Sequence, residues 1–339
     1  MLSTIVLAIS CLGLYLVGMV LWAFFLRMGL RWAKVPEVTT WGVILTTASV
    51  TVLQIATNVV QVVLSPLFDA LSLNLVLILA SAVIIPCLVI RSIFKVRYPL
   101  ALRACLPTLI AASINIALVL FVSRPYLFEA FSMPSNAMAP TLVDKHWQGV
   151  CEKCGQPNYC APMDEHFGPP GPQRMICDNF HVTEAAIVDN TVYSTDHFLV
   201  AKFLTPQRWD LVVFHFPADP NALYVMRLVG FPGEKIHIEA GAVWVNGQQL
   251  TPPDSMGDIE YVSEIPYARD LPSWGSPDRP ATLGEDEYFV LGDFSERSID
   301  SRFWDQGAPG HNPFAVPASH MKGVVTHTHW PPARWRIHR

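Results

Sequence analysis

Four long apolar stretches fill the first part of the chain, separated by short polar or basic segments. They run over Leu2–Leu26, Trp41–Leu64, Leu71–Ile90 and Ala104–Val122. Each is about as long as the ~20-residue helix that crosses a ~30 Å hydrocarbon core. Up to Val122, the acidic residues of the sequence are Glu37 and Asp69. The pattern predicts a transmembrane anchor of about four helices over residues 1–122. The first stretch is longer than a cleaved signal peptide and lacks a basic start, so we expect it to be retained.

Basic residues lie unevenly between these stretches, which predicts an orientation. Clusters follow the first and third stretches: Arg27, Arg31 and Lys34, then Arg91, Lys95, Arg97 and Arg103. The loop around Ser65–Ala70 holds neither Lys nor Arg. Loops rich in Lys and Arg stay on the cytoplasmic side. We therefore expect a multi-pass protein of the cell (inner) membrane whose C-terminal domain is extracytoplasmic.

From residue 123 onward the pattern changes to short runs rich in Val, Ile, Phe and Tyr, typical of strands. Lys235–Glu239 alternates polar and apolar residues, as a half-buried strand does. The pair Asn246-Gly247 after Val245 is a strong hairpin signal. The predicted strands are Phe198–Phe203, Leu211–Phe216, Tyr224–Val229, Lys235–Glu239, Ala242–Val245 and Tyr288–Leu291. Residues 123–339 are thus predicted to form a mainly β domain, with a Cys-rich insertion at 151–181 and a Pro/Gly-rich one at 252–284.

Composition agrees with a membrane protein and argues against a nucleic-acid partner. The chain has 339 residues, of which 51% are hydrophobic and only 15% charged, with a net charge of −5. A single soluble domain rarely has this balance. No basic block of the kind that binds nucleic acid is present in the sequence.

Four motifs stand out in the second part of the chain. The first is Met133-Pro-Ser-Asn-Ala-Met-Ala-Pro-Thr-Leu142. The others are Trp209-Asp-Leu-Val-Val-Phe214, Tyr224-Val-Met-Arg-Leu-Val-Gly-Phe-Pro-Gly233 and Leu291-Gly-Asp-Phe-Ser-Glu-Arg-Ser-Ile-Asp-Ser-Arg302. Together they resemble the motifs of bacterial type I signal peptidases, the first of which reads P-S-x-S-M-x-P-T-L. The resemblance extends from Phe131 to about Pro332, and the motifs keep the family's order and spacing.

The resemblance implies an activity and its partners. Enzymes of this family cut signal peptides from exported pre-proteins, after small residues, at the outer face of the lipid bilayer. A serine hydroxyl attacks the carbonyl, and a desolvated neutral lysine takes its proton. A backbone N–H and a serine hydroxyl hold the developing oxyanion. No cofactor is required.

The sequence departs from the family at both reacting positions. Ala137 stands where the resemblance expects the nucleophilic serine, and Met226 where it expects the lysine. Alanine has no side-chain oxygen, and a thioether is too weak an acceptor to serve as a base. Loss of the nucleophile or the base in a triad hydrolase costs on the order of 10⁶ in kcat. The chain is therefore predicted to be catalytically inactive.

Residues around the two positions are largely retained. By resemblance, Ser135 matches the oxyanion hydroxyl and Ser298 the serine that orients the lysine. Charged residues that brace the site are matched by Arg227, Asp293, Asp300 and Arg302. These four can equally be retained as a buried ion-pair network with no catalytic part. The segment Phe294–Arg297 departs from the family's usual sequence.

A cluster of Cys and His residues in the first insertion raises the question of a metal. Cys151-x-x-Cys154-Gly is a common zinc-knuckle turn, and Cys177 with His181 can complete a Cys₃His site. Disulfides are the alternative, because the outer compartment is oxidising and Cys160 makes the number of cysteines even. The sequence leaves both open, as it does a cluster with neither.

Three functions fit these patterns. The first is a family member without catalysis that binds signal-peptide-like segments, competes for them or regulates an active paralogue. The second is an active signal peptidase that uses another nucleophile such as Ser135, or whose two substitutions are particular to this version of the sequence. The third is a structural membrane protein that reuses the fold. Cleavage of a pre-protein would distinguish the active peptidase from the other two functions. Binding of a signal peptide would distinguish the inactive family member from the structural membrane protein.

Overall fold

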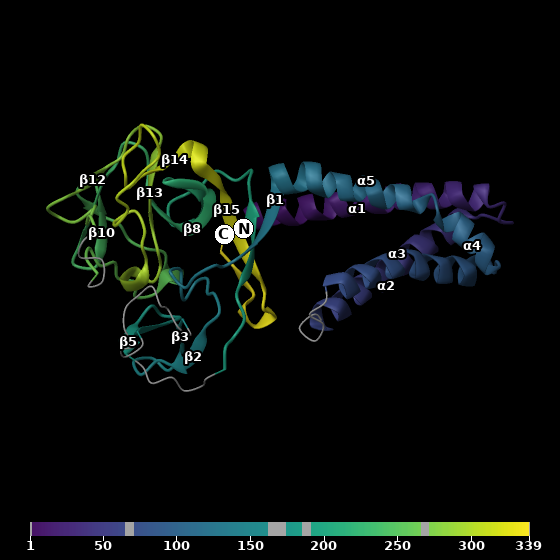
Figure 1. Cartoon of the computed structure of the whole chain (residues 1–339), viewed down its shortest axis with the longest axis horizontal. Coiled ribbons are helices and arrows are strands. Elements are labelled where there is room, and N and C mark those ends of the chain that lie inside the picture. Colours follow the sequence, from purple (N-terminus) through teal and green to yellow (C-terminus); the bar gives the residue numbers. More distant parts are fainter. Residues whose placement is uncertain (1, 65–70, 162–173, 185–190, 266–270, 339) are drawn as a thin grey trace. The chain divides into compact units, whose positions relative to one another are not determined.

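The computed structural model describes residues 2–64, 71–161, 174–184, 191–265 and 271–338. The chain divides into two compact units, Thr4–Arg124 and Pro125–Arg339 (Figure 1). Parts of the predicted loop and of both insertions, at 65–70, 162–173 and 266–270, lie outside the described residues.

The first unit is helical. Its helices are α1 (Leu2–Trp32), α2 (Thr40–Leu64), α3 (Leu71–Phe94), α4 (Tyr98–Cys105) and α5 (Thr108–Leu118), followed by the π-helical η2 (Val119–Leu127). Among the described residues, three segments are long and apolar enough to cross a membrane: Tyr15–Trp32, Thr40–Thr57 and Tyr98–Leu127. The described apolar part of α3, Ser81–Phe94, is shorter. The count of four spans thus stays a prediction.

The last apolar segment differs from the expected single helix over Ala104–Val122. Helix begins earlier, at Tyr98, and is interrupted between Cys105 and Thr108. Pro107 stands in this interruption, and proline has no N–H to continue the hydrogen-bond ladder. The loop expected over Arg91–Arg103 is consequently short, because Arg91 belongs to the last turn of α3 and Arg103 to α4.

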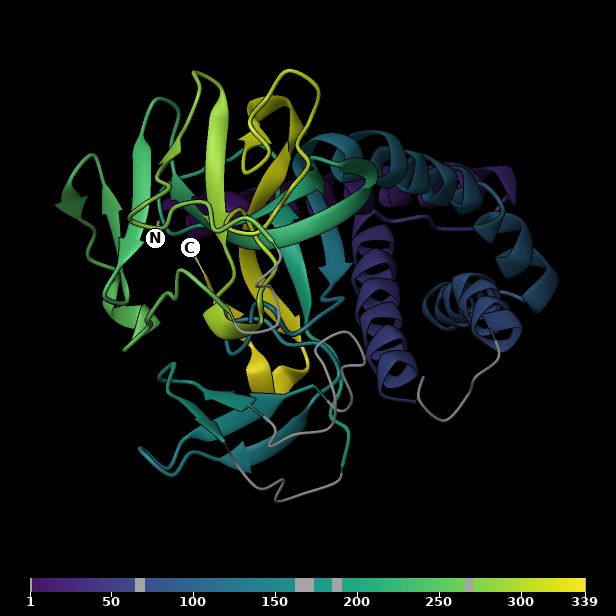
Figure 2. The same ribbon diagram turned by 60° about the vertical axis from the view of Figure 1, so that its left-hand side comes forward.

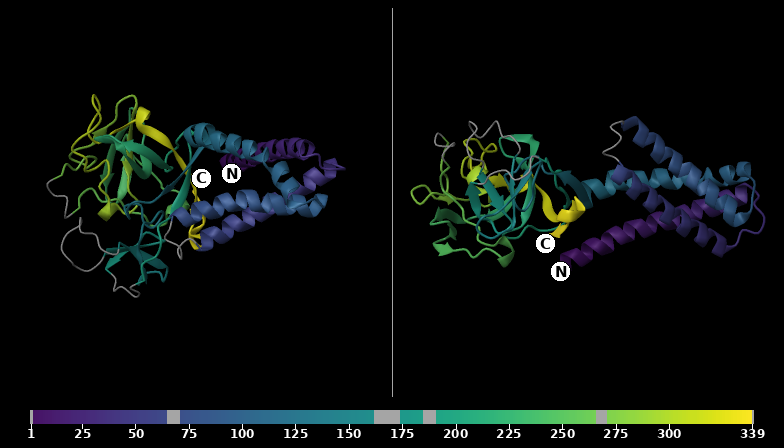
Figure 3. Two further views of the ribbon diagram at one scale, coloured as in Figure 1. Left: turned by 45° about the vertical axis from the view of Figure 1, so that its right-hand side comes forward. Right: turned by 90° about the horizontal axis from the view of Figure 1, so that it is seen from below.

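One end of the helical unit is closely packed. A Cβ atom at Gly29 of α1 would lie 2.1 Å from the carbonyl oxygen of Ala104 in α4, so glycine is required for this approach. Helices α2 and α3 lie along each other (Figure 3). The buried apolar cluster here joins the ends of α1 and α3 to the start of α2 and to α4: Leu26, Leu30, Ala33, Val35, Val43, Cys87, Ile90, Ala101, Ala104 and Cys105. The two predicted basic clusters begin near the ends of α1 and α3 and continue beyond them, so they lie at the same end of this unit.

The second unit is built on an eight-stranded antiparallel sheet with the order β1-β6-β15-β7-β8-β13-β14, in which β16 also pairs with β15. The strands are β1 (Phe128–Ser132), β6 (His197–Ala201), β7 (Leu211–Phe216), β8 (Asp219–Gly230), β13 (Glu287–Leu291), β14 (Val316–Pro317), β15 (Met321–Trp330) and β16 (Arg336–Ile337). The domain is mainly β, as the sequence predicts.

A smaller sheet packs beside it, with the order β11-β10-β9-β12. Its strands are β9 (Lys235–Glu239), β10 (Ala242–Val245), β11 (Gln248–Gln249) and β12 (Ala281–Thr282). Asn246 and Gly247 connect β10 to β11 with φ of 52° and 80°. Two successive positive φ values define the type I′ turn that Asn-Gly favours.

The Cys-rich insertion and the residues on either side of it form a sheet of their own. Its antiparallel strands follow one another in sequence order: β2 (Trp147–Val150), β3 (Pro157–Cys160), β4 (Arg174–Cys177) and β5 (Val182–Glu184). Figure 2 shows this sheet as a separate layer below the main one. The described part of the Pro/Gly-rich insertion contains only the short helix η4 (Asp254–Met256) and β12.

Candidate functional site

A cavity of about 380 Å³ opens where three of the four motifs meet. Its walls come from the loop after β1, from the middle of β8, from the region of η6 (Ser295–Arg297) and from the end of β3. The lining residues are Met133, Pro134, Ser135, Asn136, Ala137, Ala161, Leu223, Tyr224, Val225, Met226, Phe294, Arg297 and Ile299. Ser135, Ala137 and Met226, far apart in sequence, thus face the same space.

Ala137 is held through its main chain. Its carbonyl accepts a hydrogen bond from the Phe294 N–H at 3.0 Å. A Cβ atom at Gly292 would lie 2.8 Å from the same carbonyl oxygen and 2.0 Å from Ser298 Oγ. Only glycine leaves room between these two groups. The loop carrying Ala137 is therefore fixed against the last motif without help from the Ala137 side chain.

Met226 lies on β8, opposite Val212 of β7, and is 4% exposed. It belongs to the buried apolar cluster that also contains Met133 and Met138. A flexible thioether side chain packs well in such a place. The side chain thus joins the wall of the cavity to the apolar core.

Ser298 follows η6 and is completely buried. Within the described part of the chain its hydroxyl has no hydrogen-bond partner. A buried hydroxyl left unpaired costs about 1–3 kcal/mol. The resemblance assigns Ser298 the task of orienting a lysine amine, and the position expected for that lysine holds Met226.

Ser135 is exposed at the mouth of the cavity. Among the described lining residues, the titratable ones are Tyr224 and Arg297. Burial, and then the charge of Asp219, raise the pKa of Tyr224, which keeps its phenol neutral at physiological pH. The described lining therefore offers Ser135 no carboxylate, imidazole or amine as a base.

A buried ion pair and its hydrogen bonds join all four motifs beside the cavity. Arg227 Nε donates to Asp293 Oδ1 at 2.6 Å, and its Nη1 donates to the Trp209 carbonyl at 2.7 Å. Thr141 Oγ1 donates a short hydrogen bond to Asp293 Oδ2. Burial alone would lower the pKa of the Arg227 guanidinium, but the Asp293 carboxylate outweighs it and the pKa is raised. The pair binds strand β8 to the first and last motifs.

A second buried pair shapes the last motif itself. Arg302 donates to both oxygens of Asp300, at 2.8 and 2.7 Å, and to the Ser295 carbonyl at 2.9 Å. Asp300 Oδ2 also accepts the N–H of Gly292 at 2.8 Å. In this way the pair fixes the glycine that stands between Ser298 and the Ala137 carbonyl.

Sequence reasoning missed one further ion pair at the site. Arg334 donates to Asp196 Oδ1 at 2.9 Å and to the Pro140 carbonyl at 2.9 Å. Asp196 Oδ2 accepts the N–H of Val143 at 3.0 Å. The pair clamps the end of the first motif. Its members lie 138 residues apart, so no local pattern reveals it.

The structure also gathers the four predicted metal ligands. The ligand atoms of Cys151, Cys154, Cys177 and His181 all lie within 4.8 Å of one another. The six cysteines whose side chains are described are free thiols.

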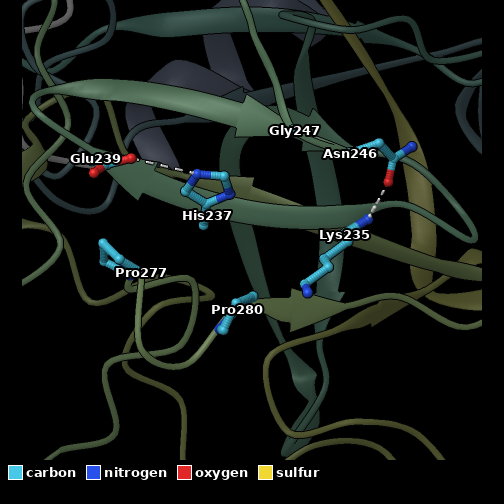
Figure 4. Close-up of a pocket in the computed structure, with 7 residues that line it drawn as sticks. All are labelled: Lys235, His237, Glu239, Asn246, Gly247, Pro277 and Pro280. Atoms are coloured by element: carbon cyan, nitrogen blue, oxygen red, sulfur yellow. Dashed lines mark hydrogen bonds and ion pairs between the residues drawn. The ribbon is translucent and has the colours of Figure 1, made fainter.

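A second hollow lies on the small sheet, with Lys235, His237 and Glu239 of β9 on one side and Pro277 and Pro280 on the other (Figure 4). His237 Nε2 lies 3.8 Å from Glu239 Oε2, and the Lys235 N–H donates to Asn246 Oδ1 at 2.9 Å. It is broad and solvent-facing, and it contains none of the residues of the four motifs.

Comparisons with known proteins agree with the motifs. Residues 174–330 match the family model described as signal peptidase, peptidase S26. The signal peptidase I of Rickettsia prowazekii is 30% identical over 205 residues, covering 54% of this chain and 68% of that protein. The signal peptidase I of Pseudomonas fluorescens is 24% identical over 208 residues, covering 55% of this chain and 59% of that protein. The chain thus spans somewhat less than two thirds of the length of that relative.

A solved structure was also matched. It is a signal peptidase I of Enterococcus faecalis V583, 27% identical, and the match covers 36% of this chain and 98% of that chain with a TM-score of 0.27. That score is too low for a spatial comparison.

The described features define a class of protein: apolar helices long enough to cross a membrane, followed by a mainly β domain with a cleft where three of the four motifs meet. The 30% identity to the Rickettsia protein, over 68% of that protein's length, identifies the family within this class. The chain belongs to the type I signal peptidase family.

Proposed function

We propose that this chain binds signal-peptide segments of exported pre-proteins in its cleft and does not cleave them. The observation that carries the proposal is the lining of one cavity by Ser135, Ala137 and Met226. An oxyanion donor remains in this arrangement, while the positions expected for the nucleophile and the base hold a methyl group and a thioether. Neither group can attack a carbonyl or take a proton near neutral pH.

The surroundings of the cavity favour retained binding. Main-chain contacts and two buried ion pairs hold its walls, and none of them depends on a serine at 137 or a lysine at 226. The lining is mostly apolar, which suits the small apolar residues near a signal-peptide cleavage site. Competition for such segments, or regulation of an active relative, would follow from binding without turnover.

An unconventional nucleophile is less well supported. Ser135 is the lining hydroxyl nearest in sequence to position 137, and an unactivated serine is a poor nucleophile. The described lining supplies it with no base. The orphaned Ser298 hydroxyl further suggests that a partner amine has been lost from this place.

The same proposal includes a location. Basic residues at the ends of α1 and α3 lie at one end of the helical unit, where Gly29 of α1 closely approaches Ala104 of α4. If this end is cytoplasmic, the chain is a multi-pass protein of the cell membrane. The β domain that follows η2 is then extracytoplasmic, on the side where exported pre-proteins emerge.

The test is cleavage of a pre-protein by the full-length chain in detergent. The unmodified chain should release no mature product, and neither should Ala137→Ser alone, because its hydroxyl lacks a base. The double variant Ala137→Ser/Met226→Lys should gain activity over both. A gain of several orders of magnitude is the scale set by the roughly 10⁶-fold loss seen when a triad member is removed.

Binding is measured separately, with a fluorescent signal peptide and the unmodified chain. We expect saturable binding that is abolished by Ala137→Trp, which fills the cavity from its lining. Cleavage by the unmodified chain that survives Ser135→Ala would show the dyad assignment to be wrong. Absence of peptide binding by a folded chain would remove the binding function and leave a structural role.

A further inference from the structure

Two hairpin turns of the Cys-rich sheet face each other. The first, between β2 and β3, carries Cys151 and Cys154. It is closed by hydrogen bonds from the Gly155 N–H to the Cys151 carbonyl at 2.8 Å and from the Cys151 N–H to the Gln156 carbonyl at 2.9 Å. Gly155 has a φ of 73°, the left-handed conformation that this tight turn requires.

The second turn, between β4 and β5, carries Cys177 and His181. Its Phe180 N–H donates to the Cys177 carbonyl at 2.7 Å, and the Cys177 N–H donates to the His181 carbonyl at 3.1 Å. Strands β3 and β4 pair side by side, with Asn158 opposite Cys177. This pairing brings the two turns to the same end of the sheet.

The distances between the side chains fit a metal at their centre. Cys154 Sγ and Cys177 Sγ are 3.7 Å apart, and Cys151 Sγ lies 3.9 Å from His181 Nδ1. A tetrahedral zinc ion with Zn–S bonds of about 2.3 Å and Zn–N bonds of about 2.0 Å separates its ligand atoms by roughly 3.5–3.8 Å. Four ligand atoms within 4.8 Å of one another therefore need little adjustment.

The histidine is oriented as a metal ligand commonly is. Its Nδ1 faces the thiols, while its Nε2 lies 3.1 Å from Asp258 Oδ2. Metal-bound histidines usually donate their other ring N–H to a carboxylate, which fixes the tautomer and the ring plane. Asp258 comes from the Pro/Gly-rich insertion, so this contact also joins the two insertions.

We propose that Cys151, Cys154, Cys177 and His181 bind one structural Zn²⁺ ion. Three thiolates and an imidazole in tetrahedral array are the donors that zinc prefers, and four protein ligands leave no open position for catalysis. A disulfide would join two of the sulfurs and give no role to the aligned histidine and its carboxylate. Convergence of all four groups on one point favours the ion.

The ion would support one wall of the cleft. Strand β3 ends at Cys160, and the next residue, Ala161, lines the cavity. On β4, Arg174 Nε donates to Glu296 Oε2 at 2.7 Å, which connects the sheet to η6 beside the cavity. Zinc that closes the two turns thus stabilises the sheet from which this wall extends.

The test is the metal content of the full-length chain, purified in detergent through a tag without histidine and without chelators. We expect about one zinc ion per chain, lost in Cys151→Ser and in Cys177→Ser. Cys160→Ser is the matched control, since this buried thiol belongs to the same sheet but not to the cluster, and it should keep the ion. Asp258→Asn should weaken binding about tenfold, within the range for a partner of a metal ligand.

A second measurement guards against variants that fail to fold. Cobalt added to the metal-stripped unmodified chain should give the visible absorption of tetrahedral thiolate coordination, and zinc should abolish it. Chelation should lower the melting temperature of the unmodified chain and leave that of Cys151→Ser unchanged. A chain without zinc that shows no cobalt absorption would overturn the proposal. So would mass spectrometry that finds these cysteines in disulfides.

Discussion

The main-chain N–H of Phe294 donates a hydrogen bond to the carbonyl of Ala137 at 3.0 Å. Through this contact the last motif holds the first, with Gly292 filling the narrow space between the Ala137 carbonyl and Ser298. Main-chain atoms alone make the contact. The shape of the loop at position 137 is therefore independent of whether its side chain carries an oxygen.

Replacement of Ser298 by alanine should raise the stability of the unmodified chain by about 1 kcal/mol. The buried hydroxyl has no partner among the described residues, and its removal relieves an unpaired polar group. Thermal unfolding of the full-length protein in detergent measures the change. In a chain that carries Met226→Lys, Ser298→Ala should instead lower the stability, because the hydroxyl then has an amine to pair with.

Ser295→Ala is the matched control for this prediction. Ser295 is equally buried, but its Oγ accepts the Val262 N–H at 2.9 Å and Arg302 Nη1 at 2.8 Å. Its loss should destabilise the chain by about 1–3 kcal/mol, since two donors lose their acceptor. Equal losses in the two alanine variants would mean that Ser298 has a partner in solution.

Arg227→Met should destabilise the β domain by about 3–5 kcal/mol, because it leaves the buried Asp293 carboxylate without its counter-ion. The double variant with Asp293→Asn should recover part of this loss. Arg174→Met serves as the comparison, since its ion pair with Glu296 is 43% exposed on the arginine side and is worth at most about 1 kcal/mol. Similar effects at the two arginines would contradict the bracing role of Arg227.

Protonation of Glu287 should lower the folding stability of the chain in acid. Burial would raise the pKa of this carboxyl, but hydrogen bonds from the N–H groups of Gly284 and Asn312, the Asn312 side chain and His311 outweigh burial and lower it. A group whose pKa is lower in the folded state stabilises the protein above its unfolded pKa and loses that effect as pH falls through its folded pKa. The stability of the unmodified chain should thus drop below about pH 4.5, the ordinary value for this carboxyl.

Glu287→Gln should remove this part of the acid dependence, so that its melting temperature approaches that of the unmodified chain as pH falls. Asn312→Ala, which takes away one donor, should show part of the same change. Melting curves recorded at a series of pH values decide the matter. Parallel curves for the unmodified chain and Glu287→Gln would mean that another group governs acid unfolding.

The proposed orientation predicts the behaviour of reporter fusions. A reporter that is active only outside the cytoplasm should be active when fused after Pro332. A reporter that is active only in the cytoplasm should be active when inserted at Lys95–Arg97, between α3 and α4. Replacement of Arg91, Lys95, Arg97 and Arg103 by neutral residues should reduce this bias. A cytoplasmic C-terminal domain would remove access to emerging signal peptides and with it the proposed function.

Strands with a clear local pattern were predicted well. The bounds of β7, β9 and β10 coincide with the predicted ones, because alternation and the Asn246-Gly247 turn are properties of neighbouring residues. None of the predicted strands lies in the Cys-rich insertion, yet with its flanking residues it forms a four-stranded sheet. Its strands are three or four residues long, too short to show a period.

Contacts between distant residues could not be predicted in this way. Family motifs named Arg227 and Asp293, but the pairing of Arg334 with Asp196 depends on where β15 and its following turn pass the first motif. The close approach of Gly29 to Ala104 likewise follows from helix packing. That the Ser298 hydroxyl lacks a partner is a property of the folded site and is absent from any sequence pattern.

The unpaired hydroxyl of Ser298 also bears on how such a chain could evolve. Alanine to serine and methionine to lysine are each single-base changes in the genetic code, so the two reacting side chains are within short mutational reach. The two changes differ in how easily the fold accepts them. A lysine at 226 would bring an amine into an apolar cluster, whereas a serine at 137 would face an open cavity. Ser298 is the residue to which the resemblance assigns the contact with that amine, and its hydroxyl has no partner among the described residues. Under the proposed function, replacement of Ser298 by alanine would leave a lysine introduced at 226 without the hydroxyl partner that the resemblance assigns to it.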